Sequence, residues 1–65
     1  MIGKIVEYDK NTQIGYILGF DDLTYFFKRR DVNDGIELEK DDIVDFDCLL
    51  NSGEIPTAVR IEKKE

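Results

Sequence analysis

The sequence predicts an all-β protein, a small closed barrel of five short, antiparallel strands. The chain contains five segments rich in β-branched and aromatic residues, separated by polar turns, and no segment has the length and period of a helix. An open sheet of five such strands would expose its edges, whereas closure into a barrel removes them. With 65 residues, the chain has room for one domain.

The five strands are expected at residues 2–8, 13–20, 23–28, 43–50 and 57–61. Polar residues at 9–12, 21–22 and 51–53 supply the tight turns. A long connection over 29–42 carries a short helical turn near 30–33 and the turn signal Asn33-Asp34-Gly35. The domain is therefore expected to span 1–62, with 63–65 as a frayed tail.

Side-chain alternation predicts which face of the third strand is buried. Tyr25 and Phe27 share one face, and Phe26 and Lys28 share the other. Because lysine is seldom found inside a barrel, Phe26 is expected on the outer face, where an exposed phenylalanine beside a cation indicates a binding site. In the second strand the same rule places Tyr16 outside and Gly15 inside, where strands approach closely. The opposite assignment, with Tyr16 and Phe26 in the core, is the alternative.

Charge is distributed unevenly along the chain. The net charge of −6 combines +1 over residues 1–30 (five Lys/Arg, four Asp/Glu) with −7 over 31–65 (four Lys/Arg, eleven Asp/Glu). An acidic protein is repelled by phosphates at long range, which argues against tight, unspecific nucleic-acid binding. The acidic residues of 31–47 are expected to be solvated surface that supports solubility.

The residue inventory argues against an enzyme and against a cofactor. There is no histidine, one cysteine (Cys48) and one serine (Ser52), so no nucleophile and base can be paired. The aspartates at 41, 42, 45 and 47 lack the spacing of a calcium loop, and no metal site is expected. No apolar run is long enough to cross a membrane, and the single cysteine fits a reducing, cytoplasmic setting.

Two short motifs give the chain a family resemblance. Residues 12–17 (TQIGYI) align with a first ribonucleoprotein motif of the type K-G-F-G-F-I, and residues 25–29 (YFFKR) align with a second of the type V-F-V-H-F. Over residues 3–61 the chain resembles a cold-shock domain, the five-stranded barrel of the oligonucleotide-binding (OB) type. The resemblance implies a non-catalytic protein that binds single-stranded RNA or DNA.

The resemblance also implies which positions are buried and which contact bases. Its buried positions correspond to Ile5, Ile17, Tyr25, Phe27, Val32, Val44, Phe46 and Ile61. Its base-stacking positions correspond to Glu7, Ile14, Tyr16, Phe26, Lys28, Arg29 and Ile36. Only two of the family's aromatic residues remain there, Tyr16 and Phe26, and the usual tryptophan of the first strand is Glu7. At about 1–3 kcal/mol for each stacked base, two stacks predict weak binding.

Nucleic-acid binding is therefore expected through Tyr16, Phe26, Lys28, Arg29, Ile14, Ile36, Lys10 and Lys4. The two outlying lysines, Lys4 and Lys10, would contact phosphates. An open alternative is an acidic OB-type interaction module that no longer binds nucleic acid and uses residues 31–47 to dock on a basic protein or to mimic nucleic acid. A monomer is expected, with a weak dimer as the other option.

Overall fold

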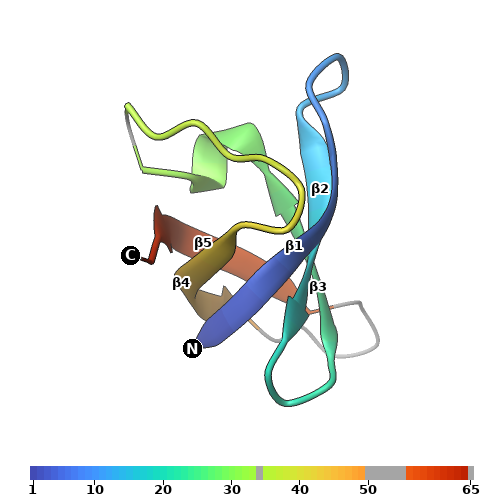
Figure 1. Ribbon diagram of the computed structural model, residues 1–65, viewed down its shortest axis with the longest axis vertical. Helices are drawn as coiled ribbons and strands as arrows, with labels where there is room; N and C mark the ends of the chain where they lie inside the picture. Colours follow the sequence, from blue (N-terminus) through green and yellow to red (C-terminus); the bar gives the residue numbers. More distant parts are fainter. Residues whose placement is uncertain (34, 50–55, 65) are drawn as a thin grey trace.

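The computed structural model describes residues 1–33, 35–49 and 56–64, which form a closed five-stranded β-barrel (Figure 1). The elements in chain order are β1 (Ile2–Asp9), β2 (Ile14–Gly19), β3 (Thr24–Lys28), the 3-10 helix η1 (Arg29–Asp31), β4 (Ile43–Leu49) and β5 (Thr57–Lys63). Around the barrel the order is β1-β2-β3-β5-β4. The all-β, OB-like barrel predicted from the sequence is confirmed.

The direction of one strand pair differs from the prediction. The pairs β1–β2, β2–β3, β1–β4 and β4–β5 are antiparallel, but β3 and β5 pair in parallel. The long connection carries the chain across the end of the barrel before β4, so β5 returns in the same direction as β3 (Figure 1). Purely antiparallel strands were therefore a wrong expectation at this one seam.

The element bounds otherwise lie close to those predicted. Strand β5 continues through Lys63, and the backbone N–H of Lys64 donates to the carbonyl of Ile43 over 2.9 Å, so these two residues are not frayed. Residue 50 of the fourth predicted strand, the 51–53 turn, Asp34 of the predicted turn and Glu65 lie outside the described residues.

The core contains every residue expected there. Tyr25, Phe27 and Phe46 are its largest buried side chains, and the rings of Tyr25 and Phe46 meet edge to face with centroids 5.0 Å apart. The remaining members are Ile5, Ile17, Val32, Leu38, Val44, Ala58 and Ile61. The alternative assignment, with Phe26 and Tyr16 inside, is excluded because both are only partly buried and neither belongs to the core cluster. Cys48 is half-buried against the core.

Two irregularities adjust which side chains face the core. In β5, Arg60 adopts a positive φ of 51°, and β4–β5 pairing shifts by one residue beside it. This bulge lets Ala58 and Ile61 both face inward although they are three residues apart. In β1, the pairing skips Val6, which leaves Val6 37% exposed.

The bulge at Val6 determines which residues of β1 lie on the outer face. Glu7 lies opposite Tyr16, and Tyr8 lies opposite Gly15. Because directly opposed residues share a face, Glu7 points outward beside Tyr16, whereas Tyr8 points toward the barrel interior. Its ring stacks on Phe27 with centroids 5.6 Å apart and planes 21° from parallel.

Gly15 keeps the two strands and the core aromatic ring in contact. A Cβ atom at this position would lie 2.6 Å from the Glu7 carbonyl oxygen and 2.7 Å from the Phe27 ring. Any larger residue would therefore force β1 or Phe27 to move. The glycine of the IGY stretch is explained by this close approach.

A buried hydroxyl at the β2–β3 turn predicts a pH dependence of stability. The Tyr25 hydroxyl donates to the Asp21 carboxylate over 2.6 Å. This hydrogen bond, with burial as a second cause, raises the pKa of Tyr25 from 10.0 to about 12, and the same bond is the main reason that the pKa of Asp21 is lowered.

The two shifts act at opposite ends of the pH scale. Because the pKa of Tyr25 is raised on folding, its contribution to stability is complete below pH 10 and disappears as the pH approaches about 12. Because the pKa of Asp21 is lowered, its contribution is present near neutral pH and disappears as the pH falls through the folded-state pKa. Urea unfolding should show Tyr25→Phe less stable than wild type at neutral pH, with the difference shrinking toward both extremes. A constant difference would contradict the assignment.

Candidate nucleic-acid interface

The outer face of β1, β2 and β3 carries an aromatic pair in its central row. Strand pairing places Glu7, Tyr16 and Phe26 opposite one another across the three strands. The rings of Tyr16 and Phe26 meet edge to face, with centroids 5.9 Å apart and planes 61° apart. We call these two residues the aromatic platform. It offers π surface to solvent, with one carboxylate at its side.

The next row of the same face adds an apolar contact and a cation. Ile14 of β2 lies opposite Lys28 of β3 and opposite Asp9 of β1. Ile14 is half-buried and Lys28 is exposed. The Asp9 carboxylate accepts a hydrogen bond from the Asn11 backbone N–H over 2.8 Å and so holds the β1–β2 turn. Lys28 therefore lies one row from the aromatic platform, and the other two residues of its row, Ile14 and Asp9, carry no positive charge.

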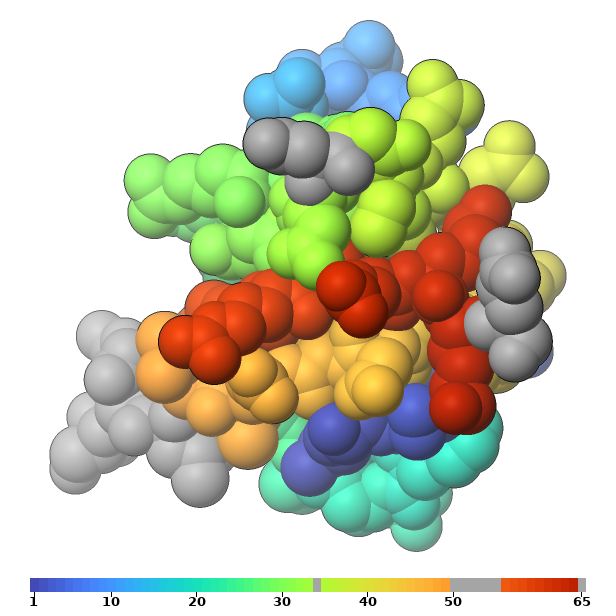
Figure 2. Space-filling view, turned by 90° about the vertical axis from the view of Figure 1, so that its left-hand side faces the viewer, coloured from blue at the N-terminus to red at the C-terminus, as the bar shows by residue number. Residues whose placement is uncertain are grey.

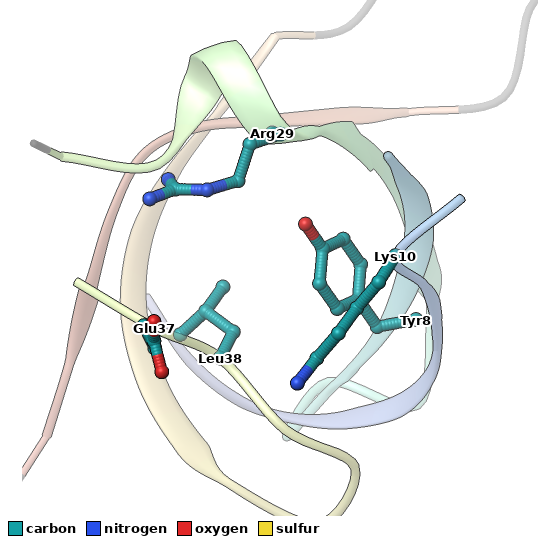
Figure 3. A pocket seen from close by; sticks show the side chains of 5 residues that line it. All are labelled: Tyr8, Lys10, Arg29, Glu37 and Leu38. Carbon is teal, nitrogen blue, oxygen red and sulfur yellow. The ribbon is translucent and has the colours of Figure 1, made fainter. Parts of the chain in front are cut away.

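Arg29 and Lys10 both line a hollow that lies beyond this row. Arg29 begins η1, where its backbone N–H donates to the Gln13 carbonyl over 2.9 Å. The cavity has a volume of about 150 Å³ and is lined by Tyr8, Lys10, Arg29, Glu37 and Leu38. Figure 3 shows the Arg29 and Lys10 chains reaching toward this opening, with Glu37 and Leu38 on the wall formed by the long connection.

Two of the predicted contact residues have other surroundings. Lys4 forms an ion pair with Asp41, with 3.4 Å between Nζ and Oδ1, and lies in the row of Leu18 and Thr24. Ile36 is half-buried and packs against the core from the connection. The structure thus brings Ile14, Tyr16, Phe26 and Lys28 together on one face and places Arg29 and Lys10 at its end.

Sequence reasoning missed the other three residues of the hollow. Tyr8 reaches it only because the bulge at Val6 reverses the alternation of β1. Glu37 and Leu38 belong to the connection, whose path across the barrel end has no periodic signal. The available signal was Tyr8 itself, the one aromatic residue of β1.

Strands β4 and β5 form a different side of the barrel, and Figure 2 shows them in gold-orange and red. Their acidic residues Asp45, Asp47 and Glu62 are exposed there. A hollow there is lined by Asn33, Asp45, Phe46, Asp47, Arg60 and Glu62. Each of its carboxylates has a partner: Asp45 the N-terminal amine at 3.3 Å, Asp47 the Arg60 guanidinium at 3.4 Å, and Glu62 the Asn33 amide at 2.6 Å. These contacts partly neutralise the surface predicted to attract a basic protein.

Within 1–33, 35–49 and 56–64, no three His, Cys, Asp or Glu side chains gather closely enough to hold an ion. In the same part of the chain, no helix has the length and hydropathy needed to cross a membrane.

Comparison with known proteins adds no family assignment. No family model matches the chain, and no curated protein matches it significantly. The resemblance to cold-shock domains accordingly rests on the two motifs, while the barrel supports the fold class alone.

Proposed function

We propose that this protein is a non-catalytic, single-stranded RNA- or DNA-binding protein of the cold-shock type. The observation that carries the proposal is the aromatic platform, in which Tyr16 and Phe26 lie side by side on the solvent face of β2 and β3. Buried aromatic residues stabilise a core, but partly exposed aromatic neighbours on a barrel face offer surfaces on which successive bases stack.

Cations near the platform supply the contact to the backbone. Lys28 is exposed one row away, and Arg29 and Lys10 line the adjoining hollow. Arg29 can also stack its guanidinium plane on a base. Glu7, which lies opposite Tyr16, opposes phosphate binding at the other side of the platform. Together with the net charge of −6, this arrangement favours weak binding that decreases with salt.

The salt dependence tests the role of these cations. Each phosphate contact to a single strand contributes a slope of about −0.7 to log K against log salt, so three contacts give about −2. Lys28→Gln and Arg29→Gln should each weaken binding. Each should also reduce the magnitude of the slope by about 0.7, the contribution of one phosphate contact. The measurement is the anisotropy of a labelled pyrimidine oligonucleotide at several salt concentrations.

Lys64→Gln is the matched control, because Lys64 follows β5 and its backbone N–H bonds to Ile43 at the start of β4. It should leave both affinity and slope unchanged. Equal effects of all three substitutions would mean that the chain responds only to net charge, without a defined backbone contact.

The second candidate is an interaction module for a basic protein. It is favoured by Glu7 at the centre of the outer face and by the carboxylates around the β4–β5 hollow. A basic partner that remains bound after nuclease treatment, and is lost in Asp45→Asn/Asp47→Asn, would support this candidate.

A further inference from the structure

The apolar side chains of the outer face continue beyond the aromatic platform. Leu18 is 38% exposed, and Phe20, directly after β2, is 69% exposed. Alternation places both on the side of Ile14 and Tyr16, because Gly15, Ile17 and Gly19 between them are buried. We call this row the β2 stripe; it consists of Ile14, Tyr16, Leu18 and Phe20. At about 3.4 Å per residue it is about 20 Å long.

The two ends of the β2 stripe carry opposite charges. On the β3 side of the first end, Lys28 lies opposite Ile14, with Arg29 following it; on the β1 side, Asp9 accepts the hydrogen bond from the Asn11 backbone N–H. At the second end, Asp21 and Asp22 directly follow Phe20. A nucleic-acid strand is attracted at the first end and repelled at the second. The proposed nucleic-acid site therefore does not explain why Phe20 is exposed.

We propose that the β2 stripe binds the β2 stripe of a second copy of this chain, in antiparallel orientation. The two-fold axis lies in the plane of contact, crosses the strands and passes between the rows of Tyr16 and Leu18. Such an interface is isologous, so each contact occurs twice. The cationic end of each copy then meets the acidic end of the other.

The strand register specifies the contacts. With this axis, Tyr16 faces Leu18 of the partner subunit, and Ile14 faces Phe20 of the partner subunit. On β1, Glu7 is in the row of Tyr16 and Lys4 is in the row of Leu18. Glu7 therefore faces Lys4 of the partner subunit, whose exposed ammonium also forms the 3.4 Å ion pair with Asp41 of its own chain.

The third strand gives a second complementary pair. On β3, Lys28 is in the row of Ile14, and the turn with Asp22 is at the level of Phe20. Lys28 accordingly faces Asp22 of the partner subunit. The carboxylate of Glu7, which is unfavourable for a nucleic-acid site, is complementary in this interface.

The association is expected to be weak. The outer face of a barrel is convex, so we expect a small contact, of the size below about 1,200 Å² that is typical of transient interfaces. The dimer does not require nucleic-acid binding, but it covers Tyr16. Oligonucleotide and second copy therefore compete for this face.

Sedimentation equilibrium without nucleic acid tests the proposal. With rising concentration toward the millimolar range, the mass should rise from 7.6 kDa toward twice that value. Glu7→Lys and Lys4→Glu should each weaken the dimer about tenfold, because each opposes like charges twice. The double variant Glu7→Lys/Lys4→Glu should restore the affinity. Phe20→Ser should also weaken it, whereas Leu49→Ser, which removes a 54% exposed leucine on β4, should not.

Three results would overturn the proposal. One is a mass that stays at 7.6 kDa throughout. Another is a dimer that is insensitive to Phe20→Ser, and a third is a double charge variant without restoration. If the protein stays monomeric and the Phe20 amide shifts on adding an oligonucleotide, the stripe extends the nucleic-acid site instead. Because the measurement contains no nucleic acid, its failure leaves the proposed function unaffected.

Discussion

Phe27→Ala is expected to unfold much of the protein at 25 °C. Phe27 has no exposed surface, its ring lies against Gly15 and it stacks on Tyr8. Truncating a buried phenylalanine costs about 3–5 kcal/mol. A domain of this size lies at the low end of the usual stability of about 5–15 kcal/mol, so the loss removes most of the free energy of unfolding. Urea and thermal unfolding followed by circular dichroism measure the effect.

Phe27→Leu is the matched control, because it keeps an apolar side chain of intermediate volume in the same place. It should remain folded with a smaller loss of stability. If Phe27→Ala melted cooperatively within a few degrees of wild type, the description of the core around this ring would be wrong.

Phe26→Ala, one residue away, is expected to have the opposite effect. The Phe26 ring is partly exposed and contacts Tyr16 on the outer face, so its removal leaves the core intact. Losing one stacked base costs about 1–3 kcal/mol, which corresponds to a decrease in affinity of about 5- to 150-fold. The anisotropy of a labelled oligonucleotide measures the affinity, and circular dichroism measures the stability.

Leu49→Ala serves as the control for Phe26→Ala, because it removes an exposed apolar side chain from β4 rather than from the outer face of β2 and β3. Its affinity for the oligonucleotide should equal that of wild type. Unchanged affinity of Phe26→Ala would contradict stacking at this position, even if the variant folds normally.

The side-chain alternation correctly placed Tyr25 and Phe27 in the core and Tyr16 and Phe26 on the outer face for one physical reason. Strands β2 and β3 are regular over residues 14–19 and 24–28, so a period of two assigns every side chain to a face. Lys28 then decided which face is outside. Where the strands are irregular, a strict period of two does not hold, because the bulges at Val6 and Arg60 change the face of the residues that follow.

The contacts between distant segments could not be predicted in the same way. Lys4 was expected at a phosphate, but the barrel places it 3.4 Å from Asp41, whose position depends on how the long connection crosses. The hollow at Arg29 likewise combines a strand, a turn and the connection. Such sites depend on tertiary packing that no local pattern encodes.

The most direct test of the central claim is an NMR titration of the ¹⁵N-labelled protein, at low protein concentration, with a short pyrimidine oligonucleotide. We predict amide shifts concentrated at Tyr16, Phe26, Lys28 and Arg29, with an affinity that decreases from low to physiological salt. If these residues show no shifts at millimolar oligonucleotide, the outer face of β2 and β3 is not a nucleic-acid site.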